Sequence, residues 1–143
     1  ATDGLVKSAP ISINFFNGQK VTINIDTISK DEVLKNSDFI TLHVPDQEDY
    51  IISAKEFEKM KVGVGIVNAS RGGVLNEVEL VKAINNGKVQ FAGLDVFETE
   101  PTPAVQLLMN PDISLTPHIG AATKEAQDRI GSELAEQIIE LLK

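Results

Sequence analysis

The sequence predicts an α/β domain with a mostly parallel sheet flanked by helices and preceded by a β-hairpin. After the first 28 residues, short apolar runs alternate with segments of helical period, as in a parallel sheet with crossover helices. Before them, two runs of alternating apolar and polar residues flank Asn17 and Gly18, which is typical of a hairpin with a tight turn. We therefore divide a single domain, 1–143, into a hairpin segment, 1–28, and an α/β segment, 29–143.

The hairpin strands are predicted at 11–16 (I-S-I-N-F-F) and 20–25 (K-V-T-I-N-I). Their polar positions alternate with apolar ones, so one face of the hairpin is expected to be solvated. These positions are Ser12, Asn14, Thr22 and Asn24.

The strands of the parallel sheet are predicted from nearly continuous apolar runs. Such runs are expected when both faces of a sheet are covered. They span 38–43, 64–68, 90–95 and 112–115.

Four helices are predicted between and after these strands, at 30–36, 53–60, 76–86 and 123–142. Ser53 with Glu56 forms a capping box at the second helix, and Asn76 has the same relation to Glu79 in a weaker form. Gly87 is suited to end the third helix in a left-handed conformation. The fourth helix carries an apolar stripe at helical spacing: Ile130, Leu134, Ile138 and Leu141.

Composition excludes several classes of function. The chain has no cysteine, which rules out disulfides and thiolate–zinc sites and agrees with a cytoplasmic location. Two histidines are too few for a histidine-based metal site, so no metal is expected. The net charge of −8 argues against a nucleic-acid partner. No apolar run approaches the ~20 residues of a membrane span.

Polar side chains follow three of the predicted strands. Arg71 comes soon after the strand 64–68, Asp95 and Glu100 come at and after the strand 90–95, and His118 follows the strand 112–115. The carboxyl ends of parallel strands meet at one edge, where ligands bind. The sequence therefore predicts a site at this edge.

Arg71 and His118 are the residues best suited to chemistry. An arginine beside Gly72 and Gly73 can grip a carboxylate bidentately, although it can equally be a surface residue beside a turn. Histidine is the usual proton carrier near neutral pH, and Glu100 is its expected partner. The alternative is that His118 only caps the last helix or binds a backbone carbonyl.

The roles of the remaining polar residues are less specific. A carboxylate at Asp95, within apolar sequence, must find hydrogen-bond donors, either on a ligand amide or on the backbone of the next loop. Glu98 alternates with Glu100 and should face the other way. His43 is interpreted as a structural or cofactor-lining residue. No G-x-G-x-x-G occurs in the chain, so a nucleotide pyrophosphate has no recognisable cradle.

These motifs together resemble the D-2-hydroxyacid dehydrogenase family over about residues 29–139. The matching stretches are L-H-V-P, I-V-N-A-S-R-G-G-V-L-N-E, A-G-L-D-V-F-E-T-E-P and L-T-P-H-I-G-A-A-T-K-E-A-Q. The ending P-H-I-G-A-A-T-K-E-A-Q-D-R-I-G is most similar to the D-3-phosphoglycerate dehydrogenase branch. The resemblance implies a partial Rossmann-type sheet, with 29–143 as the second half of a truncated NAD-binding domain that lacks the first strand, the glycine-rich turn and the substrate domain.

The resemblance also implies roles for individual residues. Arg71 would hold the substrate, His118 would be the acid/base and Glu100 would orient it. Asp95 would meet the nicotinamide and Asp3 the adenosine ribose. The full set of residues expected to line the NAD site is Asp3, His43, Val44, Pro45, Ala69, Ser70, Arg71, Asp95, His118 and Gly120.

The implied activity is hydride transfer between NAD and a D-2-hydroxy acid, with 3-phosphoglycerate as the expected substrate, which would place the protein in serine biosynthesis. A dimer or other homo-oligomer is expected. The chain alone is expected to bind NAD poorly and to be inactive. Two alternatives stay open: an NAD-sensing, corepressor-like binding protein, and an inactive excised fragment that self-associates through uncovered apolar surface.

Overall fold

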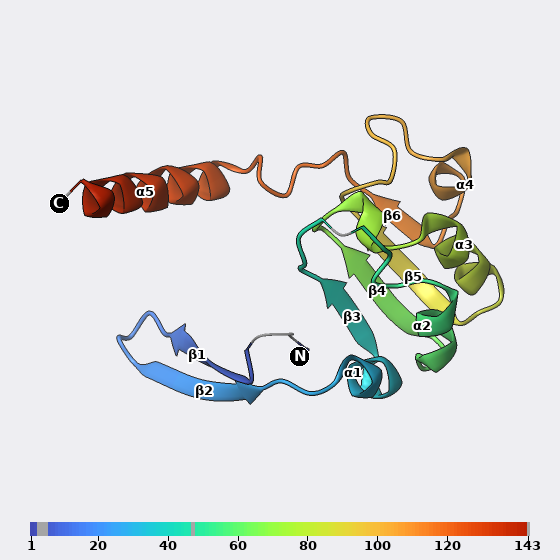
Figure 1. The fold of residues 1–143 in the computed structure, drawn as a ribbon, viewed down its shortest axis with the longest axis horizontal. Coiled ribbons are helices and arrows are strands. Elements are labelled where there is room, and N and C mark those ends of the chain that lie inside the picture. The colour runs from blue at the N-terminus through green and yellow to red at the C-terminus, as the bar shows by residue number, and fades with distance from the viewer. Residues whose placement is uncertain (3–5, 47, 143) are drawn as a thin grey trace.

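The structure is a computed structural model that describes residues 1–2, 6–46 and 48–142 (Figure 1). A four-stranded parallel sheet of order β3–β4–β5–β6 is flanked by helices, and a separate antiparallel pair, β1–β2, forms the N-terminal hairpin. This confirms the predicted fold class. The strands are β1 (Ser8–Asn14), β2 (Lys20–Asp26), β3 (Phe39–Leu42), β4 (Val64–Asn68), β5 (Val89–Leu94) and β6 (Ile113–Leu115).

The helices follow the predicted order along the chain. They are α1 (Lys30–Asn36), α2 (Ala54–Lys59), α3 (Glu77–Asn85), α4 (Val105–Leu108) and α5 (Lys124–Leu141), with a 3-10 turn, η1 (Gly72–Val74). Every predicted helix and every predicted strand of the parallel sheet is present, with ends that differ by at most one residue. Neither η1 nor α4 was predicted, because elements of three and four residues are too short to show a period.

The expected caps are present at α2 and α3. Glu56 Oε2 accepts a hydrogen bond from Ser53 N at 3.1 Å, and Asn76 Oδ1 accepts one from Glu79 N at 3.0 Å. Each bond satisfies a backbone donor that the first turn of a helix leaves free. Gly87 has φ +77° and donates to Ile84 O, so it ends α3 as predicted.

Only one face of the parallel sheet is covered by the described part of the chain, and the expectation of two covered faces was wrong. Ile40, Ile66 and Ala92 lie in register on the buried face. On the opposite face Phe39, Gly65 and Phe91 lie in register. The rings of Phe39 and Phe91 approach each other there, with their centroids 6.0 Å apart. Both rings remain exposed to solvent. Continuous apolar runs identify strands, but they do not show how many layers pack on them.

The predicted hairpin is present and lies apart from the sheet, as Figure 1 shows. Its first strand was predicted at 11–16, but β1 begins and ends earlier, at Ser8 and Asn14. Its turn is longer than expected, because Asn14 pairs with Lys20 and Gly18 N donates to Phe15 O. The polar face is solvated, and the apolar face is exposed as well. The apolar face consists of Ala9, Ile11, Ile13, Val21, Ile23 and Ile25.

Helix α5 also projects away from the sheet (Figure 1). Ala126, in its first turn, is buried, but the predicted stripe from Ile130 to Leu141 is exposed. Within the described part of the chain, no helix has the length and apolarity needed to cross a membrane. The stable packing therefore lies between the parallel sheet and helices α1 to α4, where the core residues gather.

Two neighbouring residues of β4 test this one-sided packing. Ile66 is 0% exposed and Val67 is 40% exposed, so Ile66→Ala leaves a cavity and is expected to lower the free energy of unfolding by about 2–5 kcal/mol. Val67→Ala is expected to lower it by less than about 1 kcal/mol. Urea unfolding measures both, and equal losses would contradict the uncovered face.

Candidate active site at the carboxyl edge of the sheet

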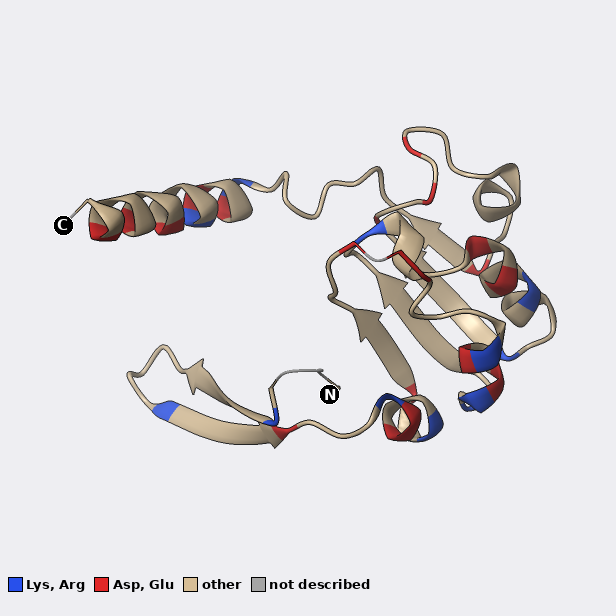
Figure 2. Cartoon of the chain, in the orientation of Figure 1, with Lys and Arg blue, Asp and Glu red and all other residues tan. Residues whose placement is uncertain are grey.

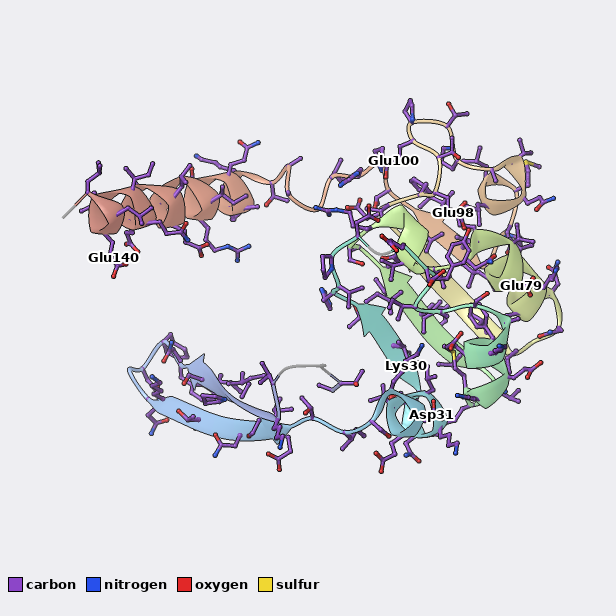
Figure 3. All side chains as sticks on the ribbon, viewed as in Figure 1. Lys30, Asp31, Glu79, Glu98, Glu100 and Glu140 are labelled. Carbon is purple, nitrogen blue, oxygen red and sulfur yellow. The ribbon has the colours of Figure 1, made fainter. Side chains whose placement is uncertain are left out.

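The polar residues singled out in the sequence lie at one edge of the parallel sheet. Arg71 follows β4, Asp95 and Glu100 follow β5, and His118 follows β6. The four strands of the parallel sheet are tan in Figure 2, because they contain no Lys, Arg, Asp or Glu, so the charges at this edge belong to the turns beyond the strands. Figure 3 shows Glu98 and Glu100 on the segment that follows β5.

His118 and Glu100 form a pair. Nδ1 of His118 lies 2.8 Å from Oε2 of Glu100, and the other carboxylate oxygen accepts a hydrogen bond from Phe97 N at 3.1 Å. The hydrogen bond with His118, assisted by that from Phe97, holds the pKa of Glu100 below its ordinary value. A carboxylate fixed in this way can orient the imidazole through one nitrogen and leave the other for proton transfer.

Asp95 holds the turn that carries His118. Its Oδ1 accepts hydrogen bonds from Thr116 Oγ1 at 2.6 Å and Ile119 N at 2.9 Å, and its Oδ2 accepts one from Gly120 N at 2.8 Å. Asp95 thus uses the backbone of the next loop, one of the two possibilities that its sequence environment allows. Within this turn His118 has a positive φ of 54°, a conformation that a non-glycine residue keeps only when its surroundings impose it.

These hydrogen bonds also determine the charge state of Asp95. The residue is only 9% exposed, and burial by itself raises the pKa of a carboxyl group. The bonds from Thr116, Ile119 and Gly120 act in the other direction and together prevail, so the pKa of Asp95 lies below its ordinary value. Asp95 is therefore a buried, ionised anchor.

Asn68, which is not among the predicted site residues, shapes the turn that carries Arg71. Its Nδ2 donates to Arg71 O at 2.8 Å, and its Oδ1 accepts from Ser70 N at 3.1 Å and Ser70 Oγ at 2.9 Å. The side chain is buried, so these bonds replace the water that its amide would otherwise bind. A polar residue at the end of an apolar run, in V-N-A-S-R, was the available signal.

Arg71 itself is exposed, and its Nη1 donates to Ser70 O at 2.6 Å. It directly precedes η1, whose first residue, Gly72, is in very close contact with the segment after β5. A Cβ atom on Gly72 would lie 1.8 Å from Phe97 O, which is far inside van der Waals contact. The absence of a side chain at Gly72 therefore allows the Arg71 turn to pack directly on the segment that leads to Glu100.

The other residues predicted to line a cofactor site lie at the same edge. His43 and Val44 follow β3, and His43 Nε2 is 2.9 Å from Thr41 Oγ1. The remaining described members of the set are Pro45, Ala69, Ser70 and Gly120, of which only Ser70 is partly buried. Asp3 lies outside the described residues.

The residues present fit the reacting end of a dinucleotide better than its phosphates. Asp95 Oδ2 accepts a bond from Gly120 N and, as a carboxylate oxygen, has a second acceptor site that an amide can use. By contrast, the chain contains no G-x-G-x-x-G turn for a pyrophosphate. Among the described residues no group of three or more His, Asp or Glu side chains is placed to hold a metal.

Residues 13–120 match the family model described as the D-isomer specific 2-hydroxyacid dehydrogenase, NAD binding domain. Among curated proteins, the chain is 45% identical over 124 residues to D-3-phosphoglycerate dehydrogenase from Archaeoglobus fulgidus, covering 85% of this chain and 24% of that protein. It is 47% identical over 123 residues to hydroxypyruvate reductase from Thermotoga maritima, covering 82% and 40%. The chain thus spans well under half of these relatives.

Solved structures show the same similarity. A glyoxylate reductase from Paecilomyes thermophila superposes with a TM-score of 0.70 at 44% identity, over 74% of this chain and 33% of that one. D-Lactate dehydrogenase from Aquifex aeolicus, solved with NAD and lactic acid, superposes with a TM-score of 0.66 at 31% identity, over 81% and 40%.

The contact between Gly72 and Phe97 generates one prediction. Gly72→Ala places a methyl group where it overlaps the Phe97 carbonyl group. This clash is expected to lower the free energy of unfolding by at least about 2 kcal/mol. Gly73→Ala is the matched control, because its nearest neighbour would be Asp46 Oδ1 at 3.8 Å, and its effect is expected to stay within about 0.5 kcal/mol. Urea unfolding of both variants measures the difference. A Gly72→Ala protein as stable as Gly73→Ala would refute the packing.

The lowered pKa of Asp95 leads to a second prediction, which concerns how the stability of the fold depends on pH. A carboxylate whose pKa is depressed in the folded state stabilises the fold above its ordinary value, 3.8 here, and this stabilisation is lost as the pH falls through the lower, folded-state pKa. We expect Asp95→Asn to lower the free energy of unfolding at pH 7 by about 1–3 kcal/mol. The difference in stability from the unaltered chain should shrink in acid, because the Asp95 carboxyl group is then protonated and is as neutral as the Asn amide.

Urea unfolding at pH 7 and at several acidic pH values measures this difference. Asp112→Asn is the control, because Asp112 is exposed just before β6 and should show little effect at either pH. A loss for Asp95→Asn that is the same at every pH would contradict the assignment.

Proposed function

Because this chain belongs to the NAD-binding domain family of the D-isomer specific 2-hydroxyacid dehydrogenases, we propose that it supplies the proton-transfer and substrate-anchoring groups of such an enzyme. One observation carries the proposal. The His118–Glu100 pair, 2.8 Å apart, lies at the same sheet edge as the Arg71 turn. A paired histidine at the same edge as an exposed guanidinium is suited to a 2-hydroxy or 2-oxo acid, whose oxygen on C2 loses or gains a proton when a hydride leaves or reaches C2.

The residues then act as follows in the direction of reduction. Arg71 binds the carboxylate of a 2-oxo acid and orients its carbonyl group. His118, held through Nδ1 by Glu100, gives the proton on Nε2 to the carbonyl oxygen as the hydroxyl forms. Glu100 remains ionised and stabilises the imidazolium before the transfer. Asp95 keeps the turn around His118 in place through its three hydrogen bonds.

The hydride would come from the cofactor, which in its reduced form supplies it to C2 when bound. Asp95, Ser70 and Gly120 are proposed to contact its nicotinamide end, with His43, Val44, Pro45 and Ala69 further along the same edge. Asp3 is proposed to meet the adenosine ribose. We propose that the isolated chain binds NAD weakly, because the phosphates lack a glycine-rich turn. Micromolar affinity in a fluorescence titration with NADH would contradict this.

The substrate proposal is 3-phosphoglycerate and its 2-oxo product, in serine biosynthesis, in a cytoplasmic homo-oligomer. Several similar curated proteins are D-3-phosphoglycerate dehydrogenases, including those from Archaeoglobus fulgidus and Mycobacterium leprae. The similarity to a hydroxypyruvate reductase makes hydroxypyruvate the competing substrate. The absence of cysteine agrees with a reducing compartment.

Activity of the natural protein that contains this sequence tests the proposal. NADH oxidation is expected with 3-phosphohydroxypyruvate, hydroxypyruvate or glyoxylate. His118→Gln is expected to lower kcat/KM roughly 10²–10⁴-fold, since it removes the proton donor. Arg71→Lys is expected to raise KM for the acid, because an ammonium cannot bind a carboxylate through two parallel bonds.

Arg129→Lys is the matched control, because Arg129 is the chain's other arginine and is exposed on α5. The proposed function would be ruled out if the protein reduced none of the three 2-oxo acids, or if His118→Gln kept full activity. NAD binding without turnover would instead favour the binding-protein alternative.

A further inference from the structure

Two glutamates outside the reacting groups bind each other's backbone. Glu77 N donates to Glu98 Oε1 at 2.9 Å, and Glu98 N donates to Glu77 Oε1 at 2.7 Å. Glu77 is the first residue of α3, and Glu98 follows β5; we call this reciprocal pair the glutamate clamp. It closes a ring between two segments that are far apart in the sequence.

The clamp joins the two segments that carry the proposed reacting groups. On one side, η1 and its cap connect Arg71 to Glu77 within six residues. On the other, Glu98 lies between Phe97, whose N–H binds Glu100, and Glu100 itself. Gly72 packs on Phe97 and Glu98 at the same place, since a Cβ atom on Gly72 would lie 1.8 Å from Phe97 O and 2.7 Å from Glu98 N.

A third segment supports the clamp from outside. Tyr50 Oη donates to Glu98 Oε2 at 3.0 Å, so both carboxylate oxygens of Glu98 are engaged. The residues after Tyr50 are tied to the Arg71 side, because Ile51 N and Ile52 N donate to Val74 O and Asn76 N donates to Ile52 O. The clamp thus lies where three segments of the chain meet: the start of α3, the segment after β5 and the loop that contains Tyr50.

Electrostatics alone would not favour this arrangement. Glu77 is 8% exposed, and burial, together with the nearby charge of Glu98, raises the pKa of Glu77 despite the hydrogen bond from Glu98 N. A buried carboxylate beside a second one is destabilising unless its hydrogen bonds are well made. The reciprocal bonds to backbone N–H groups offset this cost only in part, since the pKa of Glu77 stays raised.

We propose that Glu77 and Glu98 are positioning residues that fix the spacing between the Arg71 turn and the Glu100–His118 pair. The carboxylate of Glu98 binds Glu77 N at the start of α3 and Tyr50 Oη, and Glu98 acts through the backbone that carries Glu100. The expected effect on catalysis rests on the function proposed above. The geometric consequence of the proposal concerns the folded chain alone.

Two substitutions of Glu98 separate geometry from charge. Glu98→Gln keeps the length of the side chain and an oxygen that can accept the Glu77 N–H bond, but removes the charge. Glu98→Asp keeps the charge but is one methylene too short to reach Glu77 N. The clamp predicts that Asp is harmful and Gln is tolerated, whereas a purely electrostatic role predicts the reverse.

The first readout is the pKa of Glu100, measured by carboxyl ¹³C NMR in the chain. The unaltered chain holds this pKa below its ordinary value through His118. We expect Glu98→Asp to move it upward toward that value, because the Glu100–His118 pair loosens. Glu98→Gln should leave it low, since removal of a neighbouring negative charge cannot raise it. Glu58→Asp, at an exposed position on α2, is the control.

The second readout is kinetic, in the natural protein. Glu98→Asp is expected to lower kcat for reduction of the 2-oxo acid roughly 10- to 100-fold, the effect of a small misplacement of reacting groups. KM for NADH should be unchanged, and Glu98→Gln should stay within about twofold of the unaltered protein. Glu77→Asp and Glu77→Gln should repeat the pattern, because the clamp is reciprocal. Amide NMR spectra show that each variant is folded.

An unshifted Glu100 pKa in Glu98→Asp, or equal effects of Asp and Gln, would overturn the clamp. Absence of any dehydrogenase activity in the natural protein would instead overturn the proposed function. The Glu100 titration would then still decide the geometric inference, so the two failures are distinguishable.

Discussion

The parallel pairing of β4, β5 and β6 is the constraint on which the candidate site depends. Parallel strands all end at the same edge, so residues 47 positions apart in sequence, from Arg71 to His118, come to neighbouring turns. The ladder continues past the strands themselves, because Asp95 N donates to Asn68 O and Thr116 N donates to Leu94 O. The turns therefore start from a rigid platform, which is what a site of oriented groups requires.

The turns beyond that platform are fixed mainly by side chains that bind backbone. Asn68 shapes the turn of Arg71, Asp95 the turn of His118, and Glu98 the segment that leads to Glu100. Each is a short or medium polar residue one step removed from the reacting groups. Such residues are needed because a turn has no repeating ladder to satisfy its N–H and C=O groups.

The helices and strands could be predicted from the sequence more fully than the side chains that fix the turns. Periodicity identified the helices and the strands of the parallel sheet to within a residue because burial of an apolar face dictates it. The common edge of Arg71, Asp95, Glu100 and His118 was predicted because strand ends are predictable and these side chains are chemically distinctive, whereas their roles in a reaction stay predictions. Asn68 and Glu77 were not found, since their roles depend on which turn they meet in space.

The apolar faces of the hairpin, of α5 and of the sheet show a second limit of prediction from sequence. The alternation in the hairpin and the stripe on α5 predict which side chains favour burial, and in the structure those side chains remain exposed, as do Phe39 and Phe91 on the sheet. A two-stranded hairpin without a packed face is at best marginally stable in water. A pattern in a sequence therefore identifies the apolar face of an element, but what covers that face is a property of the surrounding structure. The supports of the candidate site do not involve these faces, because Asn68, Asp95 and Glu77 bind backbone in the turns beyond the strand ends.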